Sequence, residues 1–291
     1  MTALPVSVVI SVKNEEKNLP SCLESVRQFP ERIVVDSGST DRTPEIARAA
    51  GATLIQFNWD GKFPKKRNWV LRTHQFTQPW VLFLDADEKL TPEFVEALTK
   101  TLPSTKHDGF WLTYQNHFMG KRLRYGDKFR KIALIRVGKG EYERIDENAW
   151  SKLDMEVHEH PVVEGTLGTI HAPIVHEDFK GLYIYSRTHN EYSEWESRRF
   201  LRDVDQRNKK ELNFRQRMKY KLSQSVWIGP IYFLYSYIWK LGFLDGNEGL
   251  AFAIFKMSYF TQIAGKIREY RAQEEAVKSA PKEESNVPVT R

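Results

Sequence analysis

The first hundred residues alternate between short apolar runs and more polar segments. The run at 6–12, Val-Ser-Val-Val-Ile-Ser-Val, is continuous and rich in β-branched residues, which is typical of a strand buried on both faces of a sheet. Strands are predicted at 6–12, 33–35, 52–55 and 80–84, and helices at 18–29, from 43 and from 64 to 71. Strands that alternate with helices in this way indicate an α/β fold with a doubly wound sheet.

The pattern changes after residue 109. Apolar runs at 110–114 and 133–136 predict two further strands, joined by a long basic segment around Gly120-Lys121-Arg122. A polar region at 154–178 follows, and it contains four of the eight histidines. These segments predict a second half of the domain whose architecture differs from the first.

The carboxyl-terminal part has three sections of different composition. Residues 183–211 are strongly charged and predicted to be helical, whereas the chain becomes aromatic and apolar from residue 226. Beyond residue 271, Lys, Glu, Pro and Ser dominate, which predicts a disordered tail.

Composition and charge narrow the classes of protein. The 291-residue chain is 41% hydrophobic and 13% aromatic, which predicts a folded protein with a full core. A formal net charge of +6 is compatible with nucleic acid, an anionic membrane surface or phosphorylated substrates as partners. The single cysteine, Cys22, excludes an internal disulfide and favours a reducing compartment. The amino terminus lacks a basic segment followed by an apolar run, so we expect no secretory signal and exposure to the cytosol.

The stretch at 81–88, Val-Leu-Phe-Leu-Asp-Ala-Asp-Glu, carries the strongest candidate chemistry. Its four apolar residues predict a buried strand, and Asp85 and Asp87 then follow with only Ala between them. Because residues two apart on an extended chain point to the same side, the two carboxylates can converge on one point. Hard oxygen ligands at the carboxyl end of a buried strand suit Mg²⁺ or Mn²⁺ that carries a substrate's phosphates. The alternative is a solvated turn, with Glu88 and Lys89 opening a helix at Thr91-Pro92.

A second polar turn, Asp36-Ser37-Gly38-Ser39-Thr40-Asp41, follows the second predicted strand. A carboxylate there can accept hydrogen bonds from a nucleobase or a ribose, and Gly38 lets the backbone approach a ligand closely. Taken alone, such a turn is more often structural than functional. We expect Thr43 to cap the helix that follows, with Pro44 at its first helical position.

The order and spacing of these motifs resemble a known family. The motifs are Lys-Asn-Glu-Glu at 13–16, the polar turn at 36–41, Lys-Arg-Asn at 66–68 and Asp-Ala-Asp at 85–87. In this order they resemble the inverting family 2 glycosyltransferases with a GT-A fold. The similarity covers roughly residues 4–180. Its later part resembles the lipopolysaccharide-core glucosyltransferase subgroup, in which a Gly-Lys-Arg loop, an Ile-Arg strand end and a segment like Val157-His158-Glu159 occur in sequence.

The resemblance implies how a nucleotide sugar would be bound. Glu15 and Asp36 would contact the uridine of the donor, and Asp41 would support the same loop. Arg67 would neutralise the pyrophosphate. Each implied role matches what the residue type can do, because carboxylates accept hydrogen bonds and guanidinium groups bind phosphates.

The resemblance also implies metal ligands and a general base. Asp85 and Asp87 would hold the ribose and the metal, Mg²⁺ or Mn²⁺. An inverting transfer needs a base that deprotonates the attacking hydroxyl. Glu159 matches the position where an acidic residue meets the acceptor in this subgroup, whereas Asp178 matches the base position of many other members; we favour Glu159. His176 would then be a further metal ligand, since imidazole binds Mn²⁺.

One departure from the family pattern bears on the product. Processive members such as cellulose and chitin synthases carry a Gln-x-x-Arg-Trp motif after the base. The nearest aromatic and charged stretch here, Glu-Trp-Glu-Ser-Arg at 194–198, does not match it. The sequence therefore favours addition of a single sugar over polymerisation.

The carboxyl-terminal region predicts contact with a membrane. A polybasic segment precedes an aromatic, apolar stretch at 226–244, an arrangement that suits the headgroup region of an anionic bilayer. Gly229-Pro230 and Lys240 interrupt this stretch, so we favour an interfacial helix pair, bent at 244–249, over a transmembrane span. Packing on the enzyme or at a homodimer interface is the alternative, and nucleic acid fits poorly because the basic cluster adjoins apolar surface. The basic residues are Lys209, Lys210, Arg215, Arg217, Lys219 and Lys221.

These features together predict a metal-dependent, inverting GT-A glycosyltransferase. We expect it to move one hexose from a nucleoside diphosphate sugar, a UDP-sugar by the resemblance, to a membrane-anchored glycan at the cytosolic face of the cell membrane. The expected parts are a catalytic domain at 1–205, with a nucleotide-sugar half at 1–108 and an acceptor half at 109–205, then a helical region at 206–270 and a tail at 271–291. The rivals are a polyprenyl-phosphate sugar transferase, whose lipid phosphate acceptor needs little base, and a catalytically silent nucleotide-sugar binding protein.

Overall fold

The structure is a computed structural model that describes residues 4–144, 153–156, 160–177, 181–206, 222 and 224–279. The chain forms two compact units. The first comprises Met1–Leu182 together with Lys240–Leu250, and the second comprises Tyr183–Trp239 together with Ala251–Arg291. All sequence motifs with candidate chemistry belong to the first unit.

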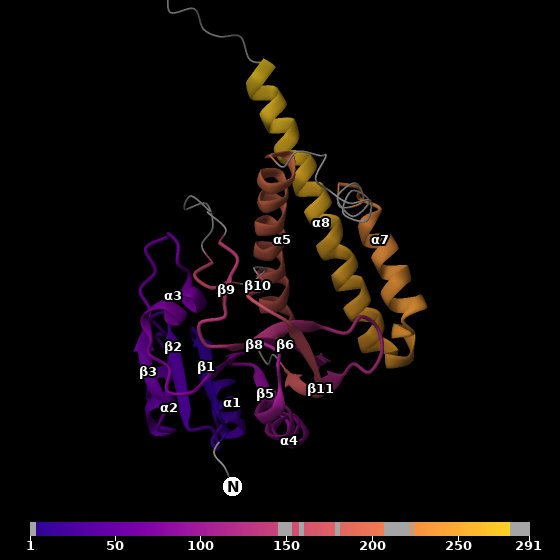
Figure 1. Ribbon diagram of the computed structural model, residues 1–291. Coiled ribbons are helices and arrows are strands. Elements are labelled where there is room, and N and C mark those ends of the chain that lie inside the picture. Colours follow the sequence, from indigo (N-terminus) through magenta and orange to yellow (C-terminus); the bar gives the residue numbers. More distant parts are fainter. Residues whose placement is uncertain are drawn as a thin grey trace, which may run out of the picture. The chain divides into compact units, whose positions relative to one another are not determined.

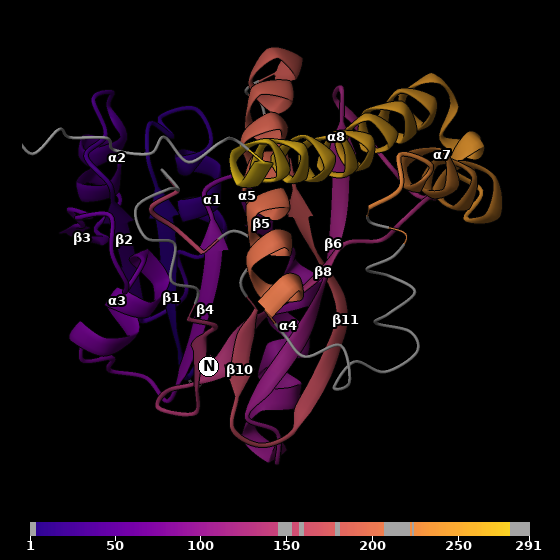
Figure 2. The same cartoon turned by 90° about the horizontal axis from the view of Figure 1, so that it is seen from above.

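A mixed sheet runs through the first unit. Its strand order within the described residues is β3-β2-β1-β4-β8-β6-β11-β5, with β7 paired to β6. Figure 1 shows β3, β2 and β1 following one another, and Figure 2 shows β4 next in the same order. The strands β1 to β4 are mutually parallel, whereas β8 runs antiparallel to both β4 and β6. The strands are β1 (Val6–Val12), β2 (Glu31–Asp36), β3 (Thr53–Gln56), β4 (Trp80–Asp85), β5 (Glu88–Leu90), β6 (Gly109–Phe118), β7 (Lys121–Arg122), β8 (Arg130–Arg136) and β11 (Leu167–His176).

Helices α1 to α3 connect the parallel strands β1 to β4, as the alternating pattern predicts, and α4 leads from β5 to β6. They are α1 (Leu19–Ser25), α2 (Thr43–Ala49), α3 (Lys66–Thr73) and α4 (Pro92–Thr101), with a 3₁₀ turn η1 (Leu102–Ser104) after the last. Together with the mixed sheet and the helical carboxyl-terminal region, they confirm the predicted α/β fold class.

Two details at the helix ends differ from the sequence predictions. Helix α1 ends at Ser25, before the predicted end at residue 29. The prediction that Thr43 caps α2 is wrong, because α2 has no side-chain cap at Arg42. The Thr43 hydroxyl instead accepts a hydrogen bond from the backbone N–H of Glu15, at 2.7 Å. Thr43 thus joins two loops rather than closing one helix.

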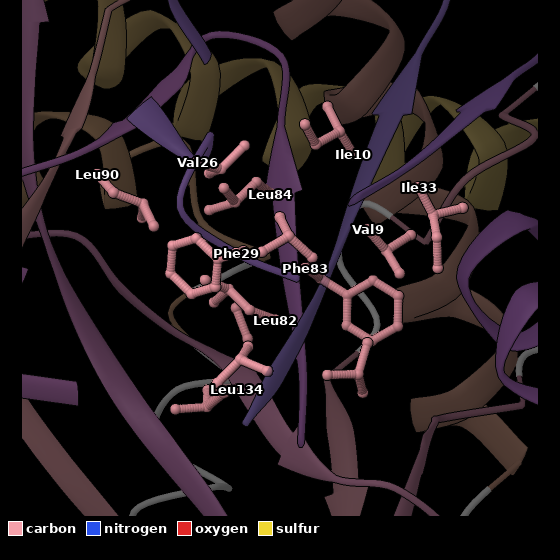
Figure 3. Close-up of a cluster of buried hydrophobic side chains, with 14 of the residues drawn as sticks. Val9, Ile10, Val26, Phe29, Ile33, Leu82, Phe83, Leu84, Leu90 and Leu134 are labelled. Atoms are coloured by element: carbon pink, nitrogen blue, oxygen red, sulfur yellow. The ribbon is translucent and has the colours of Figure 1, made fainter. Parts of the chain in front are cut away.

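The core of the first unit forms around the parallel strands. Every residue of β1 is buried, which explains why its sequence is continuous rather than alternating. Figure 3 shows Val26 and Phe29, from the end of α1 and the turn after it, gathered with Leu82 and Leu84 of β4. This packing fixes β4, and with it the position of the Asp85-Ala86-Asp87 segment that follows.

The polar region at 154–178 contains strands that the sequence did not predict. Strand β10 (Pro161–Val163) pairs with β9 (Gly140–Tyr142), and β11 runs parallel to β6. The register of β11 shifts between Ile170 and Pro173, which interrupts the alternation that usually reveals a strand. Strand β11 ends at His176, which pairs with Asn116 of β6 on one side and with Glu88 of β5 on the other.

The second unit is helical in its described part. It contains most of α5 (Gly181–Gln206) and α8 (Gly246–Ser279), together with α7 (Ile228–Phe233) and the π-helical turn η2 (Leu234–Trp239). Within the unit α5 is hydrogen-bonded to α8: the Ser197 hydroxyl donates to the Ile263 carbonyl at 3.2 Å, and Lys266 Nζ donates to the Asn190 carbonyl at 2.8 Å.

The stretch at 226–244 is broken into short helical pieces. After α7 and η2 comes a 3₁₀ turn, η3 (Gly242–Asp245). No helix of the described residues has both the length and the apolarity that a membrane crossing requires. Helix α8 extends to Ser279, beyond residue 271, where the disordered tail was predicted to begin. The six basic residues predicted to contact a membrane, at 209–221, lie outside the described residues.

Candidate active site

The loops after β1 and β2 are bound to each other by hydrogen bonds. The backbone N–H of Asn14 donates to the Ser39 hydroxyl at 2.8 Å, and the N–H of Glu16 donates to Asp41 Oδ2 at 3.1 Å. Asp41 also accepts from the backbone N–H of Thr43 at 3.0 Å, and these hydrogen bonds lower the pKa of its carboxyl although burial opposes the shift. The two loops therefore form one preformed surface at the carboxyl ends of adjacent parallel strands.

Asp36 lies at the base of this surface. It is the last residue of β2 and is 1% exposed, and its carboxylate accepts from the Ser39 N–H and from Gln56 Nε2, each at 3.1 Å. Gly38 has φ of +73°, a conformation that favours glycine and lets the turn fold back over Asp36. The carboxylate is thus held in one orientation by the protein.

Asp85 is held between two cations. Its Oδ1 accepts from Arg67 at 2.6 Å, and its Oδ2 accepts from Lys131 Nζ at 2.8 Å. Burial alone would raise the pKa of Asp85, but Lys131 and Arg67 outweigh burial and hold that pKa well below its usual range. The carboxylate therefore stays ionised, and both of its oxygens already have protein partners.

Lys131 connects Asp85 to a second carboxylate, that of Glu88. Lys131 Nζ donates to Glu88 Oε1 at 2.6 Å, and the Glu88 side chain is only 1% exposed. Burial raises the pKa of Glu88 to about 7, although Lys131 opposes the shift. The alternative in which Glu88 sits in a solvated turn is therefore wrong, although a helix does open at Pro92 with the Thr91 hydroxyl as its cap.

Asp87 and His176 face each other across the same site. His176 Nε2 lies 3.3 Å from Asp87 Oδ2. Burial would lower the pKa of His176, but the neighbouring Asp87 raises it to about 9. Asp87 Oδ1 is buried and has no hydrogen-bond partner among the described atoms, and a buried orphaned carboxylate oxygen of this kind calls for a ligand.

Asp87 and His176 could supply some, but not all, of the ligands of a divalent ion. The described residues contain no group of three His, Cys, Asp or Glu side chains placed to hold a metal. Mg²⁺ and Mn²⁺ at phosphate sites, however, need only one or two protein ligands, because the substrate and water supply the rest. Asp87 and His176 could supply those two, provided that His176 first loses its proton. A role for Asp85 as a ligand stays a prediction, since it requires that Lys131 or Arg67 release an oxygen.

Arg67 is buried and is oriented by the segment at 153–156. Its guanidinium donates to the Glu156 carbonyl as well as to Asp85. The Glu156 carboxylate in turn accepts from the backbone N–H groups of Arg67, at 2.8 Å, and Asn68, at 3.0 Å, at the start of α3. Burial raises the pKa of Glu156. Glu156 thus satisfies the otherwise open amino end of α3 and fixes the helix that carries Arg67.

Two polar side chains of β6 complete the described site. Tyr114 and Asn116 are two apart on the strand and so project to the same side. Their side-chain oxygens, Tyr114 Oη and Asn116 Oδ1, are buried without a hydrogen-bond partner in the described part of the chain. The ring of Phe129 lies 5.2 Å from that of Tyr114 and 6.3 Å from that of His176. A ligand rich in hydroxyl groups could satisfy these orphaned oxygens.

The structure brings together most of the residues that the sequence singled out. Asp85 contacts Arg67, Asp87 lies beside His176, and the Glu15 and Asp41 loops are joined to each other. Both candidate bases, Glu159 and Asp178, lie outside the described residues.

Sequence reasoning missed several residues that the structure brings to the site. Glu88 could have been recognised, because it directly follows the Asp-Ala-Asp segment. The others carried no local signal: a lysine at the start of a strand, a glutamate in a polar stretch and two polar residues within a strand. They are Lys131, Glu156, Tyr114 and Asn116.

Comparison with known proteins agrees with this geometry. The chain is 29% identical over 271 residues to the lipopolysaccharide core biosynthesis glycosyltransferase LpsC of Rhizobium meliloti, a match that covers 86% of this chain and 89% of LpsC. It is 36% identical over 146 residues to a TPR repeat-containing protein of Synechococcus elongatus; that match covers 49% of this chain but only 36% of the relative.

Solved structures give a weaker likeness. Glucosyl-3-phosphoglycerate synthase from Mycobacterium tuberculosis, solved with Mn²⁺, UDP and glucosyl-3-phosphoglycerate, shares 28% sequence identity at a TM-score of 0.33. The match covers 38% of this chain and 44% of that one.

A protein-family model gives the assignment. The model described as glycosyl transferase family 2 matches residues 7–156, which are 150 of the 291 residues and thus just over half of the chain. The match extends from β1 through the Asp36 turn, Arg67 and the Asp85-Ala86-Asp87 segment to Glu156. The chain therefore belongs to glycosyl transferase family 2, and it is a glycosyltransferase with the predicted GT-A fold.

Proposed function

We propose that this glycosyltransferase transfers a single hexose, with inversion and with the help of a divalent metal, from a UDP-sugar to a membrane-anchored glycan. The observation that carries the proposal is the Asp87–His176 pair with its orphaned oxygen, next to the buried cluster of Arg67, Asp85 and Lys131. The site lies at the carboxyl ends of adjacent parallel strands, where open α/β sheets bind their ligands.

The donor's nucleotide is assigned to the loops after β1 and β2. The register pairs Val12 with Asp36 and Ser11 with Asp85, so the ends of β1, β2 and β4 lie side by side. The Asp36 carboxylate is already oriented by the Ser39 N–H and Gln56, so a hydrogen-bond donor of a base or ribose could bind it with little reorganisation. Arg67 adds a fixed positive charge beside Asp85, at the end of β4, and a guanidinium group is suited to bind a diphosphate.

The leaving group is assigned to the Asp87 side of the site. A divalent ion bound there would neutralise the charge that develops on the departing diphosphate. Arg67 and Lys131 contribute permanent positive charge in a buried environment, where such charge is worth more than in water. Because the pKa of His176 is raised, His176 is protonated at neutral pH and gives Asp87 a cationic neighbour. A divalent ion that binds here would displace the proton of His176.

The acceptor is assigned to the half of the sheet that contains β6 and β11. Glu159, three residues beyond the anchored Glu156, is the favoured base for the attacking hydroxyl. The similarity to a lipopolysaccharide core biosynthesis glycosyltransferase over most of the chain supports a glycan of the cell envelope as acceptor. The polar, unpartnered Tyr114 and Asn116 would orient such a glycan by its hydroxyl groups.

Membrane attachment is supported by one face of the second unit. Five large apolar side chains at i, i+4, i+7, i+11 and i+12 are exposed along α7 and η2, including Trp227 at 68% and Trp239 at 80%. An apolar helical face with tryptophans suits the interfacial region of a bilayer. The five residues are Trp227, Ile231, Leu234, Ile238 and Trp239.

The donor assignment is tested by measuring nucleotide release. Purified protein is incubated with a panel of UDP-, GDP-, ADP- and TDP-sugars and Mn²⁺, and the released nucleoside diphosphate is quantified. We expect release from one or more UDP-sugars and thermal stabilisation by UDP, because a ligand that binds only the folded state raises Tm. Release from a GDP-sugar alone would overturn the uridine assignment.

The base is tested with two isosteric variants. Glu159→Gln keeps the shape of the side chain but removes the proton acceptor, so we expect turnover to fall by about a hundred- to ten-thousand-fold while UDP affinity stays near that of wild type. Asp178→Asn is the matched variant and should retain activity. The opposite pattern would assign the base to Asp178. Full activity in both variants would favour a polyprenyl-phosphate acceptor, which needs little base.

A further inference from the structure

We propose that the first unit carries its own docking surface for an anionic lipid bilayer, formed by the hairpin at 119–130 and the turn at 240–248. The two segments are called the hairpin and the turn below. The inference rests on the proposed function for one point, that the acceptor is anchored in a membrane. It adds the part of the catalytic unit that meets that membrane.

A buried carboxylate fastens the hairpin to the turn. Asp245 is 4% exposed, and its two oxygens accept from the backbone N–H groups of Arg124, at 3.0 Å, and Tyr125, at 2.9 Å. Hydrogen bonds to an ionised acceptor are stronger than those between neutral groups. One residue of the turn therefore fixes the backbone of the hairpin at two successive positions.

Further contacts make the assembly rigid. Lys121 Nζ donates to the Asp245 carbonyl at 2.8 Å and to Glu248 Oε2 at 2.9 Å, and the Gly126 N–H donates to the Lys240 carbonyl at 2.9 Å. The turn also packs tightly against the residue that follows it, because a Cβ at Gly249 would lie 2.3 Å from the Gly242 carbonyl oxygen. Ordering this surface on a partner would thus cost little additional conformational entropy.

The assembly displays large apolar side chains to solvent. Besides Phe129 at the end of the hairpin, five of them, from two segments that lie more than a hundred residues apart in the sequence, are between 41% and 58% exposed. Single exposed apolar residues are ordinary, but a group of them on one rigid structure marks an interaction surface. They are Met119, Tyr125, Leu241, Phe243 and Leu244.

Two of these side chains are displayed at a conformational cost. Met119 has a backbone φ of +52° and Leu241 has one of +60°. These values lie in the left-handed region, which residues other than glycine and asparagine rarely adopt. Glycine would relieve the strain at both positions. Strained, exposed apolar residues in both segments indicate that the side chains serve a purpose other than stability.

The charge of the hairpin indicates which partner the docking surface binds. The hairpin contains five basic residues and a single acidic one, Asp127. The acidic groups of the turn, Asp245 and Glu248, face the hairpin, where Glu248 pairs with Lys121, so four basic side chains of the hairpin are not used in this pairing. Basic side chains interleaved with exposed apolar ones match an anionic lipid surface, where both the headgroup charge and the acyl region are satisfied. The basic residues are Lys121, Arg122, Arg124, Lys128 and Arg130.

The hairpin leads directly into the candidate active site. Phe129, at its end, lies against Tyr114 and His176, and Lys131, two residues further, contacts Asp85 and Glu88. A bilayer docked on the hairpin would therefore lie at the start of the same strand that forms the site. This arrangement would present a lipid-anchored acceptor to the site without extraction from the membrane.

Vesicle binding by the full-length protein tests the surface. Partitioning is measured by flotation with vesicles of phosphatidylcholine and phosphatidylglycerol, and with phosphatidylcholine alone. We expect Met119→Gly/Leu241→Gly to weaken binding to the anionic vesicles by about tenfold, through lost apolar contact. Arg124→Glu/Lys128→Glu should weaken it by about tenfold or more and remove the preference for phosphatidylglycerol.

Matched variants separate binding from folding. Glycine at positions 119 and 241 should leave Tm unchanged or raised, because it removes backbone strain. Val162→Thr replaces an apolar side chain of the first unit that is 60% exposed elsewhere, and Lys17→Glu/Lys106→Glu reverses two exposed charges outside the hairpin. Both control variants should bind vesicles as the wild type does.

Three outcomes decide between this surface and its rivals. Normal vesicle binding by both hairpin variants, with loss in Trp227→Ser/Trp239→Ser, would overturn the inference but leave the proposed membrane function intact. Equal weakening by the control variants would also overturn it, since binding would then be nonspecific. Conversion of a dimer to a monomer by the hairpin variants, without any vesicle binding by wild type, would assign the surface to a second copy of the chain instead.

Discussion

Replacing Asp87 with Asn should reduce sugar transfer by about a hundredfold or more, the loss expected when one stabiliser of transition-state charge is removed. The substitution keeps the size of the side chain but removes the charge that pairs with His176 and, in the proposed site, with the metal. The fold should be retained, because the Oδ1 atom of Asp87 makes no hydrogen bond within the described residues. Transfer is measured as UDP release in the presence of acceptor-bearing membranes.

A surface aspartate provides the control for this substitution. Asp60 lies in the loop before α3, where its Oδ1 accepts from the Lys62 N–H at 3.0 Å. Asp60→Asn should leave transfer near wild-type levels. An Asp87→Asn protein with unaltered transfer rates would remove Asp87 from the mechanism.

Replacing Lys131 with Met should lower the free energy of unfolding by about 3–5 kcal/mol at pH 8, the cost of leaving a buried charge unpaired. Lys131 is the cation that Asp85 and Glu88 share, and Glu88 is almost completely buried. Asp85 would keep Arg67, whereas Glu88 would lose its cationic partner. Urea unfolding measures the change.

The pH dependence of this variant follows from Glu88. Its folded pKa, raised to about 7, exceeds the ordinary value, so the neutral form is favoured in the folded state and ionisation costs stability as pH rises. Without Lys131 this cost increases, so Lys131→Met should lose less stability at pH 5.5 than at pH 8. Adding Glu88→Gln should recover part of the loss. An equal loss at both pH values would contradict an unpaired Glu88 as the cause.

A lysine at the surface shows what an ordinary ion pair contributes. Lys100 pairs with Glu96 one turn away on α4, and both side chains are mostly exposed. Lys100→Met should leave the unfolding free energy close to that of wild type, because exposed pairs contribute little. A comparable loss in both lysine variants would mean that burial is not the reason for the effect.

The fold of the first hundred residues could be predicted because its signals are local. The β-branched run of β1 and the apolar run of β4 are buried on both faces, and their only polar residues before the strand ends are the small Ser7 and Ser11, which do not obscure the pattern. Strand β11 could not be predicted in this way. It contains Gly168, Pro173 and a register shift, and its pairing with β6 is formed between residues far apart in the sequence.

The contrast between local sequence signals and long-range contacts also applies to the residues of the site. Asp85, Asp87 and Asp36 could be predicted because each lies at the end of a strand, or two residues beyond it, and the apolar pattern defines where that strand ends. Lys131 and Glu156 reach the site only through tertiary structure, one from an antiparallel strand beside β4 and the other from a segment that packs on α3. Single-sequence patterns carry no information on which distant lysine will neutralise a buried carboxylate.

Calorimetric titration of the protein with UDP, in Mn²⁺ and in excess EDTA, tests the metal-assisted donor site most directly. In the proposed site Asp87 and His176 hold an ion that binds the diphosphate, so UDP affinity should fall by about tenfold or more when the metal is removed. Asp87→Asn should bind UDP weakly in both conditions. Equal UDP affinity with and without metal, accompanied by full transfer in EDTA, would contradict the metal site.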